Sequence, residues 1–192
     1  MADPHLLVPA DVLWVLLCAY IANATATFSR GKGPSMDFGR EWPGDHRRLL
    51  GPSKTWAGFW IGTFFAFPFG LLEAYLVGIA PPSLQLVPSF GPTLWAAVPV
   101  AFLLSAGAMV GDAAGSFIKR RFDRPSGTRT LLLDQLPFVL VPIALGALLY
   151  PSIFVPTFFS WEAILWLLLF TLGLHAAFNW VGFKLHLKRV PW

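Results

Sequence analysis

The chain has 192 residues, of which 56% are hydrophobic and only 12% are charged, with a formal net charge of +4. Soluble domains average about 25% charged residues, so this composition argues against a soluble globular protein and predicts an integral membrane protein. A single cysteine, Cys18, excludes an internal disulfide and a cysteine-rich metal site.

Uncharged segments mark five candidate membrane spans along the chain. Each is close to the roughly 20 residues that cross the hydrocarbon core of a bilayer. Prolines separate the second span from the third and end the fourth. We therefore predict an all-α polytopic membrane protein in which residues 1–192 form one integral membrane domain. The predicted transmembrane helices cover about residues 8–30, 55–79, 93–121, 131–150 and 159–186.

The placement of charge predicts the orientation of these spans. All 14 lysines and arginines lie in the loop between spans 1 and 2, the loop between spans 3 and 4, or the C-terminal tail. With five spans, these three segments fall on one side of the membrane, and the positive-inside rule makes that side cytoplasmic. We therefore expect the N-terminus outside, the C-terminus in the cytoplasm and two basic cytoplasmic loops. No signal peptide is expected, because the N-terminus lacks a basic region.

The end of the first basic loop has the features of an anion site. In GPSKTWAG at 51–58, Ser53 or Thr55 can cap the second span, and Lys54 can reach a phosphate. Gly58 leaves a smooth helix face against which a ligand can lie. A helix N-terminus with such groups suits a bound phosphate. The spacing of the glycines and the lysine is not that of a Walker A loop.

The third span carries an acid, Asp112, in apolar surroundings. Asp112 lies seven residues before Lys119 and therefore about 10 Å deeper along a helix. An acid inside a membrane is costly, which favours a functional role over a structural ion pair. Ser116 and Lys119 share its helix face at the i+4 and i+7 positions. Small residues on either side of Asp112 would let another helix approach closely.

A second acid, Asp134, begins the fourth span. In that position it can simply complement the helix dipole. The chain between Asp112 and Asp134, however, runs out through a basic turn and back, which brings both acids to one membrane face. Two carboxylates at this place would suit Mg²⁺, which takes few protein ligands together with phosphate oxygens.

Other polar residues allow two interpretations. The basic residues of the second loop would meet phosphate charge, although the positive-inside rule alone also requires some of them. They are Lys119, Arg120, Arg121 and Arg124. Asn23, in the middle of the first span, could serve a helix–helix hydrogen bond or a ligand contact. His175 and Asn179, four residues apart in the last span, favour an interhelical hydrogen bond, with a contact to a lipid phosphate as the alternative.

Five stretches of the sequence carry a resemblance to a known family. They are Asn23 in the first span, GPSKTWAGFWIG at 51–62, GDAAGSFIKRR at 111–121, LDQLPF at 133–138 and HAAFNWVGFKLHLKRVPW at 175–192. With them the chain resembles the CDP-archaeol synthase family, the archaeal branch of the CTP-dependent lipid cytidylyltransferases related to CDP-diacylglycerol synthase. The resemblance covers essentially the whole chain. It departs from the bacterial signature at Gly127-Thr128-Arg129, where a His-Gly-Gly element would precede the second acid.

The resemblance implies a nucleotidyltransferase of phospholipid biosynthesis in the cell membrane. CTP and an unsaturated archaeal ether-lipid phosphate, of the bis-geranylgeranyl-glycerol phosphate type, would give CDP-archaeol and pyrophosphate on the cytoplasmic side. Mg²⁺ would be held by Asp112 and Asp134, and Lys54 of the first loop joins them as a predicted catalytic residue. The predicted substrate-binding residues are Asn23, Ser53, Thr55, Gly58, Ser116, Lys119, Arg120, Arg121, Arg124, Gly127, His175 and Asn179.

Two alternative functions remain. A CDP-alcohol phosphotransferase would also work at this membrane face, but its D-x-x-D-G-x-x-A-R pattern is absent from the sequence. A small anion transporter or a membrane scaffold is the alternative without catalysis. A transporter would show paired broken helices near the midplane, whereas the polar residues here gather toward one face of the membrane.

Overall fold

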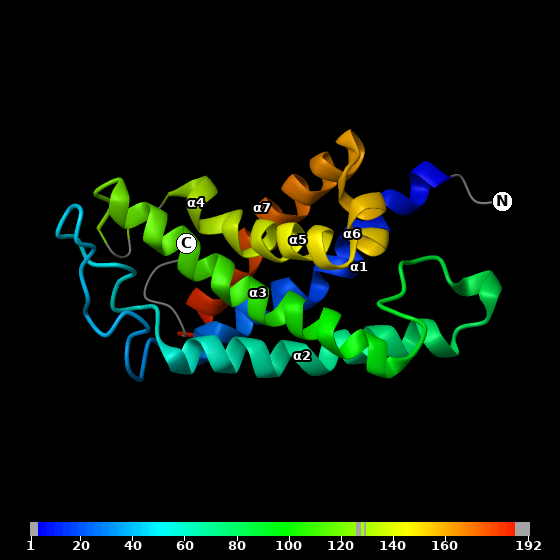
Figure 1. Ribbon diagram of the computed structural model, residues 1–192, viewed down its shortest axis with the longest axis horizontal. Helices are drawn as coiled ribbons and strands as arrows, with labels where there is room; N and C mark the ends of the chain where they lie inside the picture. The colour runs from blue at the N-terminus through cyan, green and yellow to red at the C-terminus, as the bar shows by residue number, and fades with distance from the viewer. Residues whose placement is uncertain (1–3, 126–127, 129, 187–192) are drawn as a thin grey trace.

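The computed structural model describes residues 4–125, 128 and 130–186, which fold into an elongated bundle of helices (Figure 1). In chain order the elements are α1 (Pro4–Thr25), η1 (Ala26–Ser29), α2 (Trp56–Ile79), η2 (Pro82–Leu84), α3 (Leu94–Arg121), α4 (Leu131–Gln135), α5 (Pro137–Leu149), α6 (Pro151–Phe158) and α7 (Trp161–Lys184). We call residues 30–55, between η1 and α2, the first loop. The first loop, the C-terminal end of α3 and α4 lie at the same end of the bundle, which we call the loop end.

Four helices are long and apolar enough to cross a membrane, and they confirm four of the five predicted spans. These candidate spans are Val8–Ser29, Trp56–Ile79, Leu94–Arg121 and Trp161–Lys184. The local sequence explains where the last three begin. Thr55, Thr93 and Ser160 each occupy an N-cap and accept a hydrogen bond from the backbone N–H three residues further on.

The fourth predicted span is broken, so the prediction of one continuous helix over 131–150 is wrong. The chain forms the short helix α4, then α5 of 13 residues, then α6. Pro137 lacks a backbone N–H and cannot continue the hydrogen-bond ladder of α4, so α4 ends at Gln135 and α5 begins at Pro137. At 1.5 Å per residue, α5 rises about 20 Å, less than the ~30 Å of a hydrocarbon core.

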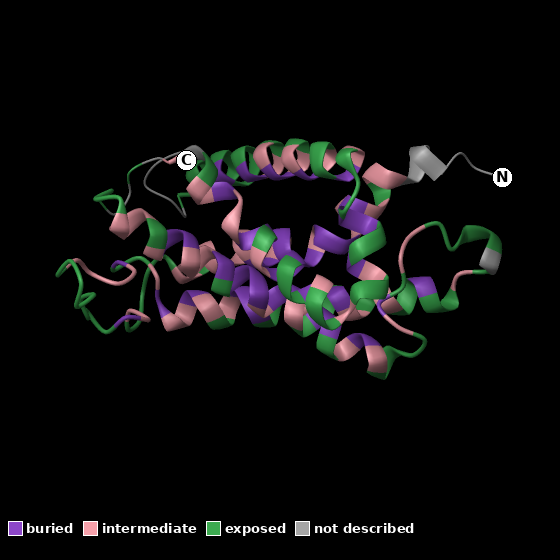
Figure 2. Cartoon of the chain, turned by 45° about the horizontal axis from the view of Figure 1, so that its top comes forward, coloured by how far each residue is buried: buried purple, intermediate pink, exposed green. Residues whose placement is uncertain are grey.

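Helix α3 lies at the centre of the bundle and packs against α1, α2 and α5. The core between these helices is apolar and includes Leu16, Leu104, Phe138 and Val139. Figure 2 shows buried positions where the helices face one another and exposed positions on their outward faces. Large side chains such as Trp60 and Phe64 are exposed on α2, as expected for helix faces that contact lipid.

Two glycines let the chain between α4 and α5 lie directly on α3. We call this segment, residues 133–138, the elbow. A Cβ atom at Gly111 would overlap the carbonyl oxygen of Pro137 and lie 2.7 Å from the Cα of Phe138. A Cβ atom at Gly115 would lie 2.7 Å from the carbonyl oxygen of Leu133. Only glycine permits backbones to approach so closely, so the two glycines set the spacing between α3 and the elbow.

Helix α2 buries an acid in its second half. Glu73 is only 4% exposed, and neither oxygen of its carboxyl group has a hydrogen-bond partner among the described residues. Glu73 lies about 25 Å along the helix from Trp56, at 1.5 Å per residue. It is therefore remote from the loop end.

The first loop is folded around the buried side chain of Asp37. This carboxylate accepts hydrogen bonds from the Arg48 guanidinium at 2.9 and 3.0 Å and from the backbone N–H groups of Gly39, Leu50 and Gly51 at 3.0 to 3.1 Å. Burial by itself would raise the pKa of Asp37, but these hydrogen bonds outweigh it and hold the pKa well below its ordinary value. The loop is therefore a defined platform rather than a flexible linker.

Candidate active site

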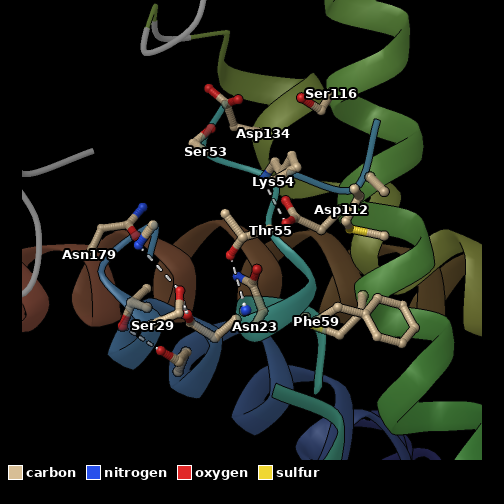
Figure 3. Close-up of a pocket in the computed structure, with 18 of the residues that line it drawn as sticks. Asn23, Ser29, Ser53, Lys54, Thr55, Phe59, Asp112, Ser116, Asp134 and Asn179 are labelled. Carbon is tan, nitrogen blue, oxygen red and sulfur yellow. Dashed lines mark hydrogen bonds and ion pairs between the residues drawn. The ribbon is translucent and has the colours of Figure 1, made fainter. Parts of the chain in front are cut away.

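A cavity of about 480 Å³ lies at the loop end, between η1, the first loop, α2, α3 and α7 (Figure 3). Twelve of the fifteen residues predicted for the site from the sequence line it. They come from segments far apart in the chain and comprise Asn23, Ser53, Lys54, Thr55, Gly58, Asp112, Ser116, Lys119, Arg120, Asp134, His175 and Asn179.

The first acid of the cavity, Asp112, is paired with a lysine of the first loop. Its Oδ2 atom lies 2.6 Å from Nζ of Lys54, and both side chains are partly buried. The position of Lys54 follows from its neighbours. Thr55 caps α2 by accepting a hydrogen bond from the N–H of Gly58 at 3.1 Å, and the carbonyl of Lys54 accepts one from the N–H of Met36 at 2.8 Å.

The second acid, Asp134, is paired with a lysine of α3. Its Oδ1 atom forms a short ion pair with Nζ of Lys119, and its Oδ2 atom accepts a hydrogen bond from the backbone N–H of Thr130 at 2.7 Å. The bond to Thr130, the N-cap residue of α4, makes Asp134 a cap for this helix as well as part of the cavity wall. Each acid of the cavity therefore has a lysine partner.

Cations outnumber acids along the cavity wall. Arg30, Lys54, Lys119 and Arg120 line it, against Asp112 and Asp134. The Nε atom of Arg120 is buried and has no hydrogen-bond partner within the described part of the chain. A concave site with this charge balance attracts anions, and fixed guanidinium and ammonium groups suit phosphate oxygens.

A less charged part of the wall comes from α1 and α7. The Nδ2 amide of Asn179 donates to Nδ1 of His175 at 2.9 Å, and both side chains are buried. Phe178 and Met109 add apolar surface, and Figure 3 shows Asn23 and Asn179 on the side of the cavity away from Asp134.

Three residues predicted for the site are not placed there. Arg121 points toward the first loop, where its guanidinium donates to the carbonyl oxygen of Arg48 at 2.8 Å. Arg124 is exposed beyond the end of α3, and neither arginine lines the cavity. Arg121 points away from the cavity because successive residues at the end of α3 point in different directions. Gly127 lies outside the described residues.

The sequence reasoning also missed one wall of the cavity. The turn formed by η1 brings Ser29, Arg30 and Gly31 to the cavity, with Arg30 in a left-handed backbone at φ 51°. The available signal was the run of hydroxyl residues that ends the first span directly before an arginine and a glycine.

The donor set restricts which metal the cavity could hold. Among the described residues, no group of three or more histidine, cysteine, aspartate or glutamate side chains is arranged to hold a metal ion. The protein therefore offers two carboxylates, Asp112 and Asp134, with no thiolate beside them. Mg²⁺ accepts one or two carboxylates together with substrate phosphates, so these residues fit this ion.

Comparisons with known proteins match the chain over almost its full length. The family model described as CDP-archaeol synthase (CarS-like) matches residues 5–192. A CDP-archaeol synthase of Thermococcus gammatolerans is 41% identical over 180 residues, covering 94% of each chain. One of Archaeoglobus fulgidus is 37% identical over 186 residues, covering 94% of this chain and 96% of the relative.

A solved structure described as an intramembrane enzyme for archaeal membrane lipids biosynthesis has a similar fold. Its TM-score is 0.61 at 32% identity, and the match covers 87% of this chain and 91% of that chain. With a family model and relatives that match almost the full length, the chain belongs to the CDP-archaeol synthase family.

Proposed function

We propose that the chain transfers CMP from CTP to an unsaturated archaeal ether-lipid phosphate, giving CDP-archaeol and pyrophosphate. The observation that carries the proposal is that two lysine–carboxylate pairs, Lys54–Asp112 and Lys119–Asp134, meet in one cation-rich cavity. Membership of the CDP-archaeol synthase family supports the same reaction. The cavity lies in the helical bundle of a multi-pass membrane protein, where a lipid substrate can reach it from the bilayer.

The reaction is a displacement at phosphorus. An oxygen of the lipid phosphate forms a bond to the α-phosphorus of CTP while the bond from this phosphorus to the bridging oxygen breaks, and pyrophosphate leaves with the electron pair. No general base is required, because a phosphate monoester is already an anion at neutral pH. The work of the protein is therefore to position two anions and to offset their charge.

The cations of the cavity have distinct places in this scheme. Lys54, Lys119 and Arg120 offset the charge of the triphosphate and of the departing pyrophosphate. Asp112 and Asp134 would hold Mg²⁺, which when bound supplies further charge neutralisation on the triphosphate.

The wall formed by α1 and α7 would receive the lipid phosphate. Asn23 and His175 would contact it there, and the pairing of His175 with Asn179 orients the imidazole. The described residues that α1 and α7 contribute to the cavity include no lysine or arginine, so this wall suits the smaller anionic charge of the lipid phosphate. The apolar surface of Phe178 beside them suits the start of an isoprenoid chain.

The loop end is proposed to face the cytoplasm, with the N-terminus outside. The support is the restriction of all lysines and arginines to the first loop, to the C-terminal end of α3 with the turn after it, and to the C-terminal end of α7 with the tail. A thiol-reactive reagent that cannot cross membranes tests this orientation on a Glu41→Cys variant, since Cys18 is fully buried. Labelling in inverted vesicles and none in intact cells is expected, and the reverse pattern would contradict the orientation.

The activity is tested with the purified full-length chain in detergent, given Mg²⁺, radiolabelled CTP and an archaeal-type lipid phosphate. CDP-lipid and pyrophosphate are the expected products, and Asp112→Asn and Asp134→Asn should each lose at least about a hundredfold in rate. Asp123→Asn is the matched control, because this exposed acid does not line the cavity. Absence of product from the unaltered chain would refute the reaction, and release of CMP from a CDP-lipid would indicate the phosphotransferase instead.

The metal assignment has a separate readout. Electron paramagnetic resonance of Mn²⁺ titrated with CTP should show tighter binding to the unaltered chain and to Asp123→Asn than to either cavity variant. Equal binding in all four proteins would overturn the assignment of the metal to Asp112 and Asp134, whatever the activity.

A further inference from the structure

We propose that Arg121 is a positioning residue that holds the first loop against α3 and thereby sets the place of Lys54 opposite Asp112. The inference deepens the proposed function and rests on it, because the effect of Arg121 on the reaction is argued to pass through Lys54.

The guanidinium of Arg121 contacts the first loop through both of its terminal nitrogens. Its Nη1 atom donates to Oδ1 of Asp45 at 2.9 Å. Its Nη2 atom donates to the carbonyl oxygens of Arg47 at 3.2 Å and Arg48 at 2.8 Å. One side chain at the end of α3 thus holds three acceptors within four residues of the loop.

Two aromatic rings lie beside this contact. The guanidinium carbon of Arg121 lies 4.9 Å from the ring centre of Phe117, one turn back on α3, and 5.9 Å from that of Trp42 in the first loop. The two rings meet edge to face at 5.5 Å. A guanidinium beside aromatic rings is held more firmly than a lysine would be, because it combines cation–π contact with a fork of hydrogen-bond donors.

The loop also binds α3 in return. Nη1 of Arg47 donates to the carbonyl oxygen of Arg121 at 3.1 Å. Nearer the cavity, the hydroxyl of Ser116 donates to the carbonyl oxygen of Leu50 at 2.8 Å. The segment 45–50 is therefore attached to the last two turns of the helix that carries Asp112.

The attachment continues from this segment to Lys54. Asp37 holds the backbone N–H groups of Leu50 and Gly51, directly before the proline and serine that precede Lys54. The N–H of Met36, next to Asp37, donates to the carbonyl of Lys54 at 2.8 Å. A short series of contacts to the loop backbone, which begins at Arg121, therefore fixes the position of Lys54 relative to α3.

A direct contact between Arg121 and substrate does not fit this geometry. Both terminal nitrogens already donate to the loop, and the side chain is absent from the cavity wall. Arg120, the preceding residue, lines the cavity instead. Removal of Arg121 should therefore act on catalysis only by loosening Lys54.

A double-mutant cycle in kcat/KM for CTP tests this route. Arg121→Gln should lower kcat/KM by about tenfold to a hundredfold, the scale of a misplacement near 1 Å. In a Lys54→Gln background, Arg121→Gln should cause less than about a twofold further loss, since the residue it positions is gone. Losses that multiply would overturn the proposal and indicate that Arg121 acts on substrate directly.

A structural readout accompanies the kinetics and does not depend on activity. Spin labels at Glu41→Cys and Ile118→Cys, two exposed positions, report the distance between the loop and α3, and the buried Cys18 is protected from labelling. The distance distribution should be narrow in the unaltered chain and in Arg40→Gln, an exposed arginine of the same loop, and should broaden in Arg121→Gln. An unchanged distribution would refute the clamp even if CDP-lipid synthesis itself failed.

If Arg121→Gln does not fold, Asp45→Asn is the second variant. It removes one acceptor at the partly exposed rim and leaves the arginine in place. Its loss in kcat/KM should be smaller than that of Arg121→Gln. In the Lys54→Gln background, the same substitution should cause no further loss. A loss that persists in that background would overturn the proposal.

Discussion

Substituting Gly111 by alanine tests whether the close contact between α3 and the elbow positions the catalytic acids. The added Cβ would overlap the carbonyl oxygen of Pro137 and lie 2.7 Å from the Cα of Phe138. Both obstacles are backbone atoms, so no change of rotamer relieves them. The elbow would have to retreat, and Asp134 belongs to it.

The size of the effect follows from these distances. Ordinary van der Waals contact begins at 3.4 Å, so the Cα of Phe138 must move by at least about 0.7 Å. Overpacking of this kind costs about 1 to 3 kcal/mol, which exceeds the gain of up to about 1 kcal/mol from replacing glycine by alanine in a helix. A net loss of stability is expected, and a shift of this size at Asp134 should lower the rate by up to about a hundredfold.

The measurements are CDP-lipid formation and thermal unfolding in detergent. Gly173→Ala is the matched control, because a Cβ there meets nothing within 4 Å in the middle of α7. The control should keep its activity and unfold at the same temperature or slightly higher. A Gly111→Ala protein as active and as stable as the control would refute the idea that the glycine contact sets the position of Asp134.

Three further predictions concern the walls of the cavity and the first loop. Arg120→Gln should raise KM for CTP about tenfold, the scale of one charge-assisted hydrogen bond, while Arg124→Gln stays within about twofold; similar effects from both would contradict the placement of these arginines. His175→Ala should raise KM for the lipid phosphate about tenfold and leave KM for CTP unchanged, and an equal rise in both would count against the proposed lipid wall. The lowered pKa of Asp37 means that its contribution to loop stability is present above its ordinary value of 3.8 and is lost as the pH falls below it. Hydrogen exchange at Leu50 and Gly51, corrected for its intrinsic pH dependence, should therefore show protection that fades only below about pH 4, whereas Asp37→Asn should lack this protection at neutral pH.

Four helices were predictable from the sequence because each contains a long, mostly apolar run. Thr55, Thr93 and Ser160 are N-cap residues at the first position where the apolar run can begin. The break in the fourth span was not predictable, because prolines are common inside membrane helices and only some of them interrupt the helix. Whether Pro137 kinks or breaks a helix depends on the packing around it, and here the chain lies directly on α3 at Gly111 and Gly115.

The sequence could predict whether a residue lines the cavity where that residue lies on a helix whose direction is known. Asp112, Ser116 and Lys119 share one face by spacing alone, and all three line the cavity. The same reasoning could not predict which of the arginines at the end of α3 lines the cavity. Arg120 and Arg121 are adjacent and chemically identical, and only the folded first loop determines that one faces the cavity and the other the loop.

Glu73 has a consequence for how the bundle assembles in a membrane. An ionised acid within a lone membrane helix is costly, up to roughly 2.5 to 3.5 kcal/mol at the helix centre, so α2 by itself is a less favourable span than its length indicates. In the finished bundle the carboxyl group is covered, with α1 and α3 packed against the same helix. We therefore expect α1, α2 and α3 to associate early and as a unit, because the second span reaches a favourable environment only once its neighbours are beside it.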